Sequence, residues 1–513
     1  MVSKVLSSAV LGIDAYIVEV EANLSGAQLP KFITVGLPEG AVKESKERVT
    51  AAIRNSDFIL PYKHITINLA PADIRKEGSA FDLPIAVGIL AATGAVKQNF
   101  LNNLLLLGEL ALDGSLRPIK GALPIAINAA KKGIKGIILP NENAQEAGIV
   151  DGIKVAGVDS LAEVAALLNG KMSMDPIKVD RQKLFNEQKN YDLDFADVKG
   201  QEHVKRAIEV AAAGGHNAIM IGPPGSGKTM LAKRLPTILP DLVLEEALQT
   251  TKIHSVAGLL PDGKGLIATR PYRSPHHTIS DAGLIGGGTV PKPGEVSLAH
   301  NGVLFLDELP EFKKNVLEVM RQPLEDGSVT IARATMSLSY PSNFMLVAAM
   351  NPCPCGYATD PKNECTCNPQ LIQKYMSRIS GPLMDRIDIH IEVPSISFDE
   401  LSEKESGEAS KFVQKRVQNT RNVQLTRFEG RDSIFCNAQM ESKNIADYCK
   451  IDKEASDLLK TAMEKLGLSA RAYDRILKVS RTIADLESLK EISSQHVSEA
   501  IQYRSLDRKL WLQ

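Results

Sequence analysis

The stretch Gly222-Pro-Pro-Gly-Ser-Gly-Lys-Thr229 decides the fold of the middle of this chain. It follows the short apolar segment Asn217–Ile221 and precedes Met230–Leu235, which has helical character. A glycine-rich loop between a strand and a helix lets backbone N–H groups turn toward phosphate oxygens, while its lysine neutralises them and its threonine binds Mg2+. We therefore expect ATP and Mg2+ to bind at Gly222, Pro223, Pro224, Gly225, Ser226, Gly227, Lys228 and Thr229.

A second motif, Gly302-Val-Leu-Phe-Leu-Asp307-Glu308, lies downstream. An apolar run that ends in two carboxylates is typical of a buried strand whose C-terminal end faces such a loop. Asp307 is expected to hold the Mg2+ through water, and Glu308 to polarise the attacking water. Asn351 follows another apolar run, so we expect its amide to meet the γ-phosphate from a neighbouring strand end.

Composition limits the classes of protein that fit. A chain of 513 residues is too long for one hydrophobic core and predicts two to four domains. The 60 basic and 61 acidic residues nearly cancel, so any contact with nucleic acid must be local, for example in the channel of a ring. Aromatic residues make up 5% of the chain, which argues against a large base-stacking surface.

Three features predict a cytoplasmic protein with no membrane partner. No uninterrupted apolar run reaches the ~18–20 residues of a membrane helix. The apolar run at Met1–Ile13 loosely resembles a signal peptide, but Asp14 ends it. Four of the six cysteines lie in Cys353–Cys367, which suits a reducing compartment and a metal site better than a disulfide framework.

The residue pattern predicts an α/β multidomain protein in four parts. Residues 1–172 alternate strands and helices, residues 173–194 are a polar linker, residues 195–395 suit a parallel α/β core, and residues 396–513 are mostly helical. Within the first part we predict strands at Tyr16–Ala22 and His64–Leu69 and a helix at Gly40–Asn55. In the last part we predict helices at Asp399–Lys411, Lys453–Leu466, Arg471–Leu486 and Ser493–Tyr503.

A cysteine cluster stands apart from the phosphate motifs. Cys353, Cys355, Cys365 and Cys367 place four soft ligands within fifteen residues, as a tetrahedral structural Zn2+ site needs. The C-x-C spacing is less usual than C-x2-C. Unpaired cytoplasmic cysteines and an iron–sulfur cluster therefore stay open as alternatives.

Several long strings resemble the magnesium-chelatase-like AAA+ family, and more closely its YifB/ComM branch. The similarity runs over nearly the whole chain and is carried by the strings PKFITVGLPEGAVKESKERV, NLAPADIRKEGSAFDLPIA, RSPHHTISDAGLIGGG, AHNGVLFLDELPEF, NPCPCG, RISGPLMDRIDIHIEVP and SARAYDRILKVSRTIADL. The resemblance implies an N-terminal Lon-protease-like α/β domain, a central AAA+ P-loop core and a C-terminal helical lid. It also implies a homo-oligomeric ring, expected to be a hexamer.

The resemblance assigns roles to further residues. Arg386 in LMDRIDIH takes the arginine-finger position, with Arg378 as the second candidate. Such an arginine, supplied by a neighbouring subunit, stabilises the charge of the phosphoryl-transfer transition state. Arg471 fits the sensor 2 position, with Arg475 as the alternative, and Asn351 fits sensor 1. Without the family pattern, a surface salt bridge would be the better interpretation of any of these arginines.

A rival interpretation is an ATP-dependent protease, because GELALDGSLRPIKGALPIAINAAKKG resembles the proteolytic domain of Lon. That chemistry needs a serine activated by a lysine. Leu123 stands where the lysine belongs, and Ser79 is out of register by one, with Ala80 at the expected place. Lys76 and Lys120 are possible substitutes. We expect this domain to serve assembly or substrate handling instead.

The use of the ATP has three candidates. The ComM branch implies a motor on DNA that drives branch migration, and the hairpin pattern Asp326–Pro341 with Arg333 would suit a pore loop. The alternatives are a motor subunit of a metal chelatase and a protein-remodelling ATPase. His276 and His277 resemble ligands or catalytic groups, but we expect them to hydrogen-bond locally beside the site.

Overall fold

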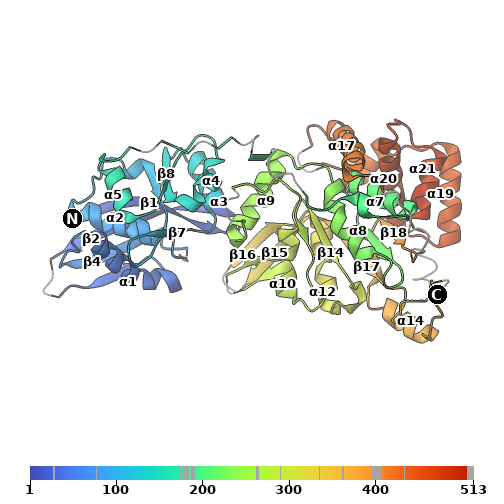
Figure 1. The fold of residues 1–513 in the computed structure, drawn as a ribbon, viewed down its shortest axis with the longest axis horizontal. Helices are drawn as coiled ribbons and strands as arrows, with labels where there is room; N and C mark the ends of the chain where they lie inside the picture. Colours follow the sequence, from blue (N-terminus) through green and yellow to red (C-terminus); the bar gives the residue numbers. More distant parts are fainter. Residues whose placement is uncertain are drawn as a thin grey trace. The chain divides into compact units, whose positions relative to one another are not determined.

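The computed structural model describes the chain except residues 27–28, 75, 77, 174, 178, 181–183, 186–190, 262–264, 289, 334–335, 361–362, 396–406, 432–433, 505 and 507–513. The chain forms two compact units (Figure 1). The first comprises Met1–Lys189 and Leu244–Ala268, and the second Asn190–Val243 and Thr269–Gln513. Both units combine sheets with helices, so the predicted α/β multidomain class is confirmed.

The first unit is built on a seven-stranded sheet with the order β3-β4-β2-β1-β5-β8-β9. Its strands are β1 Val2–Leu11, β2 Asp14–Ser25, β3 Phe32–Val35, β4 His64–Ala70, β5 Leu104–Leu106, β8 Gly136–Pro140 and β9 Lys154–Val158. The signal-like apolar start is therefore a central strand, paired antiparallel with β2 from Val2 to Leu11. Strands β5, β8 and β9 continue the sheet in parallel.

Helices and short elements complete the first unit. They are α1 Gly40–Asn55, α2 Asp82–Thr93, α3 Ala122–Lys131, α4 Asn141–Gly148, α5 Leu161–Leu168 and α9 Leu244–Ala257, with η1 Leu101–Asn103 and the short hairpin β6 Glu109–Leu110 and β7 Leu116–Arg117. Helix α1 buries Val42, Val49 and Ile53 and exposes its charged residues, as an amphipathic helix should. The strands and the helix predicted in this unit are confirmed as parts of β2 and β4 and as α1.

Helix α9 belongs to the first unit although it follows the phosphate loop in sequence. Glu146 of α4 accepts a hydrogen bond from the Leu123 amide at 2.8 Å and another from the hydroxyl of Ser255 in α9. The Gly121 amide donates to the Ser255 carbonyl at 3.2 Å. Burial raises the pKa of Glu146, and these donors oppose that rise. A buried, satisfied carboxylate thus fixes α9 to α3 and α4.

The second unit contains a five-stranded parallel sheet with the order β11-β14-β17-β10-β18. Its strands are β10 Ala218–Ile221, β11 Tyr272–Arg273, β14 Val303–Leu306, β17 Met345–Met350 and β18 Ile389–Glu392. Every residue of β10, β14 and β17 is buried, as expected for a parallel sheet covered on both faces. Because the three strands are parallel neighbours, the segments that follow them meet at one edge of the sheet.

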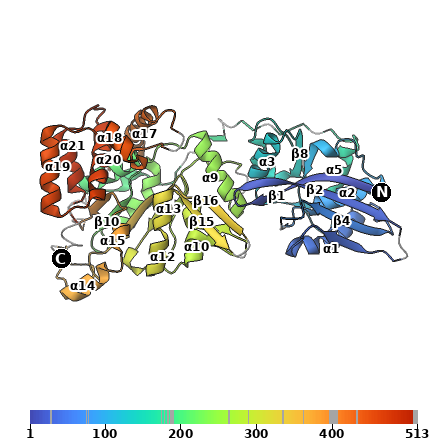
Figure 2. The same cartoon turned by 180° about the vertical axis from the view of Figure 1, so that it is seen from behind.

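Shorter elements complete the second unit around this sheet. They are η2 Phe195–Asp197, α7 Glu202–Gly214, α8 Lys228–Arg234, η3 Leu235–Ile238, α10 Asp281–Ile285, β12 Gly286–Gly287, β13 Lys292–Pro293, α11 Glu295–Leu298, η4 Leu309–Glu311, α12 Lys314–Val319, α13 Arg321–Asp326, β15 Ser328–Arg333, β16 Met336–Pro341, α14 Pro369–Met376 and α15 Gly381–Met384. Strands β15 and β16 form the predicted antiparallel hairpin (Figure 2).

The C-terminal part of the second unit is helical, as predicted. It contains α17 Ser410–Arg427, η5 Asn437–Gln439, α18 Ser442–Tyr448, α19 Lys453–Leu466, α20 Ala470–Leu486 and α21 Ser494–Gln502. Most of the predicted helix at Asp399–Lys411 lies outside the described residues. Of the helices that the structure describes, none is long and apolar enough to cross a bilayer.

Candidate functional site

The phosphate loop connects β10 with α8, as predicted. A side chain at Gly222 would come within 2.0 Å of the Val393 carbonyl oxygen, so only glycine fits the start of the loop. Lys228, the first residue of α8, donates from Nζ to the carbonyl oxygens of Gly222 and Pro223, each at 2.8 Å. Burial lowers the pKa of Lys228 to about 8, while the charge of Asp307 acts in the opposite direction. The ammonium is therefore held inside the loop at the cost of desolvation.

The ends of β14 and β17 bring the predicted partners to this loop. The Thr229 hydroxyl donates to Asp307 Oδ2 at 2.7 Å, so the two predicted Mg2+ ligands are adjacent. Lys228 Nζ lies 3.3 Å from Asn351 Oδ1. Four residues from three separate motifs thus form one cluster, which is the arrangement that phosphoryl transfer to water requires.

Glu308 has a partner that the sequence did not reveal. His277 Nδ1 lies 3.2 Å from Glu308 Oε2, and the imidazole packs edge-on against the Phe312 ring with 6.4 Å between centroids. Glu308 adopts a φ of +51°, a conformation that non-glycine residues rarely take and that often marks functional sites. His276, by contrast, bonds locally to the Thr278 hydroxyl, as expected for both histidines. Only the fold brings His277 to the carboxylate.

The four candidate arginines differ in their surroundings, and Arg475, the alternative to Arg471, forms an ion pair with Asp388. Arg378 is half exposed and bonds Glu311 Oε2 at 2.9 Å and the Pro310 carbonyl at 3.1 Å. Arg386 is buried and pairs with Glu325 of α13. Arg471, at the start of α20, is 62% exposed and lies 3.8 Å from Asp385. Arg378 and Arg471 are thus open to solvent, while Arg386 is held inward.

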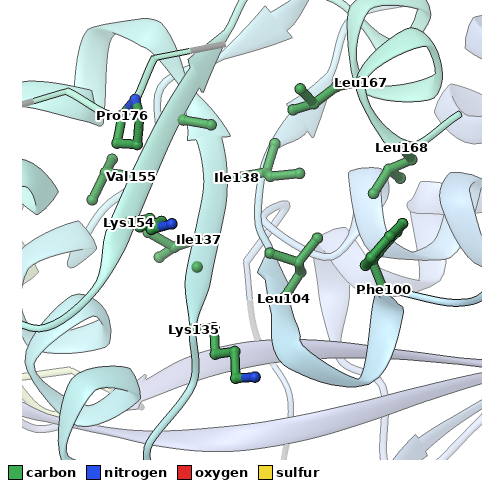
Figure 3. A pocket seen from close by; sticks show the side chains of 12 residues that line it. Phe100, Leu104, Lys135, Ile137, Ile138, Lys154, Val155, Leu167, Leu168 and Pro176 are labelled. Carbon is green, nitrogen blue, oxygen red and sulfur yellow. The ribbon is translucent and has the colours of Figure 1, made fainter. Parts of the chain in front are cut away.

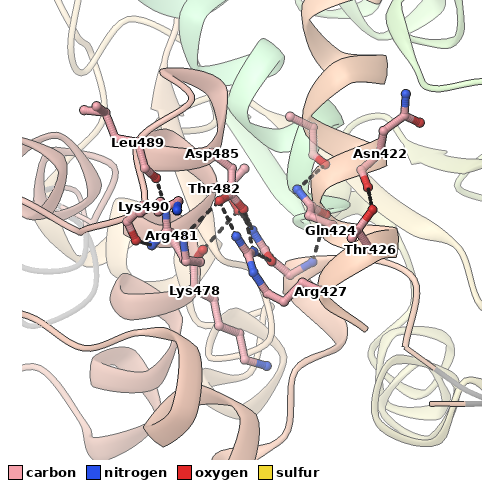
Figure 4. A network of polar contacts seen from close by, with 12 residues as sticks. Asn422, Gln424, Thr426, Arg427, Lys478, Arg481, Thr482, Asp485, Leu489 and Lys490 are labelled. Carbon is pink, nitrogen blue, oxygen red and sulfur yellow. Dashed lines mark hydrogen bonds and ion pairs between the residues drawn. The ribbon is translucent and has the colours of Figure 1, made fainter. Parts of the chain in front are cut away.

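Polar contacts join helices α17 and α20 (Figure 4), and further contacts join α20 to the core. Arg427 of α17 forms a two-pronged ion pair with Asp485 of α20, at 2.5 and 2.7 Å. One turn earlier, the Thr482 hydroxyl lies 2.8 Å from His216 Nε2. The other ring nitrogen of His216 lies 3.1 Å from Asp388, directly before β18. Helix α20, which carries Arg471 in its first turn, is therefore anchored to the sheet that carries the phosphate loop.

The four clustered cysteines converge. Their sulfur atoms all lie within 4.8 Å of one another, and Cys353 and Cys355 are 3.3 Å apart. A backbone hydrogen bond from Tyr357, together with the thiol of Cys353, lowers the pKa of Cys355 to about 5. Four sulfur donors at this spacing suit a tetrahedral thiolate site, for which Zn2+ is the common occupant.

The protease residues of the first unit do not form a serine–lysine pair in the part of the chain that the structure describes. Ser79 donates its hydroxyl hydrogen bond to the carboxylate of Glu109. Lys76 is fully buried and donates to the Ile74 carbonyl at 2.7 Å. Burial lowers the pKa of Lys76, but its nitrogen is engaged elsewhere. A carboxylate accepting from Ser79 is not the base that this chemistry needs.

The first unit also contains a cavity of about 290 Å³ (Figure 3). Apolar side chains of β5, β8 and α5 line it, including Leu104, Ile138 and Leu168, together with the stems of Lys135 and Lys154. Sequence reasoning did not anticipate this cavity, because strands and a helix far apart in the chain form its wall.

Comparison with known proteins supports the family. The family model described as magnesium chelatase, subunit ChlI, matches residues 194–401, and related models for subunit ChlI of Mg-chelatase and its C-terminal part match residues 19–143 and 407–504. Competence protein ComM of Haemophilus influenzae is 45% identical over 99% of this chain and 98% of its own. YifB of Escherichia coli is 44% identical over the same shares. Lon protease 2 of Bacillus subtilis is 34% identical over 28% of this chain and 27% of its own. The chain belongs to the magnesium-chelatase-like AAA+ family, in its YifB/ComM branch.

Proposed function

We propose that the protein is a cytoplasmic AAA+ ATPase that hydrolyses ATP at the edge of the five-stranded sheet. The observation that carries the proposal is the convergence of Lys228, Thr229, Asp307 and Asn351 at the ends of three parallel strands. In this proposal Lys228 turns from the loop carbonyls to the β- and γ-phosphates. Thr229 and Asp307 hold the Mg2+, which when bound neutralises phosphate charge.

Glu308 and Asn351 supply the remaining chemistry in this proposal. Glu308 accepts a proton from the attacking water, and the Asn351 amide orients that water beside the γ-phosphate. The His277 imidazole, at 3.2 Å, holds the Glu308 carboxylate in a defined direction. Release of that contact leaves both carboxylate oxygens free to accept from water.

The active site is completed by a neighbouring subunit of a ring, which we propose to be a hexamer. Arg386 and Arg378 are the two candidates to reach the γ-phosphate of the next subunit: Arg386 would first have to part from Glu325, whereas Arg378 is half exposed. We propose that Arg471, exposed on the lid, contacts the phosphates from the other side. Hydrolysis is then a property of the ring rather than of the single chain.

DNA is the proposed substrate of the motor, with branch migration or helicase action as its outcome. Similarity to a competence protein over nearly the whole chain supports this choice over a chelatase motor or a protein-remodelling ATPase. The hairpin β15–β16 offers a local basic contact, because Arg333 is exposed near its tip and bonds the Gly288 carbonyl at 3.2 Å. We propose that residues 1–172 serve assembly or substrate handling, with residues 173–194 as linker, residues 195–395 as ATPase core and residues 396–513 as lid.

We further propose that Cys353, Cys355, Cys365 and Cys367 bind a structural Zn2+. The observation that supports it is the approach of four sulfur atoms to within 4.8 Å in a loop with no disulfide. Metal analysis of protein purified without added zinc tests this proposal, with one Zn2+ per chain expected.

The DNA proposal is tested by the ATPase rate with single-stranded, duplex and forked DNA and with no DNA. Forked DNA is expected to raise the rate several-fold, and the binding to weaken steeply with salt because it rests on phosphate contacts. Arg333→Ala should reduce the stimulation while the rate without DNA is unchanged. Lys460→Ala, an exposed cation on α19, is the matched control. Equal rates with every DNA would refute the DNA motor.

A further inference from the structure

The cysteine cluster lies in the segment that connects two parts of the ATPase site. Cys353 comes two residues after Asn351, and Cys367 directly precedes Asn368, which caps α14 by accepting from the Leu371 amide at 2.8 Å. Between Asn351 and Asn368 the described residues form no helix or strand. The four sulfur atoms are therefore the feature that joins the start of this segment to its end.

The first half of the segment packs on the phosphate loop. Gly356, next to Cys355, adopts a φ of +90° and approaches Pro224 so closely that a side chain there would come within 2.5 Å of Pro224 Cδ. The Gly356 amide donates to the Cys353 carbonyl at 3.0 Å, which closes a tight turn. The backbone of this turn at Gly356 therefore packs directly against Pro224 of the loop that carries Lys228.

The second half leads to two further parts of the site. On α14, burial raises the pKa of the Tyr375 phenol, and the backbone of Asn351 acts on this phenol in the opposite direction. Arg378 follows α14 and bonds Glu311, three residues after Glu308. The segment thus packs on the phosphate loop, begins two residues after the sensor asparagine and leads into the helix that precedes the candidate trans-acting arginine.

We propose that the Cys353–Cys367 segment, once its cysteines hold a metal ion, is a strap that positions Asn351 and the phosphate loop for hydrolysis. The inference rests on the proposed ATPase activity and on the proposed zinc site. A loop this short has no core of its own, so its geometry depends on the metal. Without the ion, the four sulfur atoms no longer hold the start of the segment to its end, and the turn at Gly356 is no longer fixed against Pro224. Misplacement of about 1 Å at a catalytic site is enough to lower turnover about a hundredfold.

The test separates metal binding from positioning. Gly356→Ala keeps all four cysteines but adds a methyl group against Pro224, so zinc content should stay at one per chain while kcat falls by about tenfold or more. Gly430→Ala is the matched control, because Gly430 also has a positive φ, of +80°, but a side chain there meets nothing within 4 Å. Affinity for a fluorescent ATP analogue and the melting temperature are measured on the same samples.

A double-mutant cycle identifies the residue through which the strap acts. The C365S/C367S variant should lose zinc and lose turnover, and combining it with Asn351→Ala should cost little beyond Asn351→Ala alone, because both changes remove one positioning effect. Thr366 is an exposed residue between the two cysteines, and the Thr366→Ala variant shows what a substitution at this place does when all four cysteines are kept. If the cysteine variant does not fold, wild-type protein is treated with a zinc-selective chelator in excess Mg2+, and added Zn2+ should restore turnover.

Each outcome bears on one claim. Wild-type protein without zinc refutes the zinc site, and wild-type protein without turnover refutes the ATPase. Zinc-free protein, or the Gly356→Ala variant, with wild-type kcat and ATP affinity overturns the strap while leaving both proposed functions intact. Additive losses in the cycle overturn the claim that the strap acts on Asn351.

Discussion

The buried lysine of the phosphate loop makes ATP binding depend on pH in a defined direction. Burial lowers the pKa of Lys228 to about 8, so the free protein loses this charge as the pH rises through 8. Bound phosphates raise the pKa of Lys228 and keep its ammonium charged, because anionic phosphate oxygens replace the carbonyl oxygens of Gly222 and Pro223 as its partners. Binding should therefore take up about 0.5 proton at pH 8, and affinity should be about tenfold weaker at pH 9 than at pH 7.

The assay is titration calorimetry with Mg2+ and ATP in buffers of different ionisation enthalpy, on the Glu308→Gln variant so that hydrolysis does not interfere. Proton uptake is the slope of the observed enthalpy against the enthalpy of the buffer. Lys233→Met, which removes an exposed lysine of the same helix, should leave the uptake unchanged. Uptake below about 0.1 proton at pH 8, or an affinity that is flat from pH 7 to 9, would refute the reasoning.

Three other substitutions have expected outcomes. His277→Ala frees the Glu308 carboxylate, so the rate of phosphate release without DNA should rise two- to fivefold. This rise corresponds to a barrier lower by about 1 kcal/mol or less, and a fall in the rate would contradict it. Arg378→Ala should cut turnover about a thousandfold with an unchanged melting temperature, since its role is in the neighbouring subunit; near-normal phosphate release would oppose it. Arg48→Met leaves the buried carboxylate of Asp82 without its partner, so urea unfolding of the first unit should show a loss of about 3–5 kcal/mol, and a loss under about 1 kcal/mol would disprove it.

Local sequence signals were sufficient where one motif determines one structure. The phosphate loop lies between β10 and α8 because its apolar strand, glycines and helix follow one another in the chain. The acidic pair ends β14 for the same reason. The convergence of the four cysteines also follows from their short spacing.

Contacts between distant segments were beyond sequence reasoning. His277 and Glu308 are 31 positions apart, and no sequence motif that includes either residue predicts their contact. Helix α9 packs with the first unit because Ser255 meets the buried carboxylate of Glu146, 109 residues earlier. The ion pair between Arg386 and Glu325 likewise depends on the packing of α13, and no sequence motif predicts that packing.

Phosphate release by purified protein tests the central claim most directly. Wild-type protein and Glu308→Gln are compared with Mg2+ and ATP over a range of protein concentrations that spans ring assembly. We predict that wild-type turnover per chain rises with assembly, and that Glu308→Gln binds ATP with similar affinity but loses turnover about a hundredfold or more. Equal turnover by the two proteins, or none by wild type at any concentration, would contradict the account.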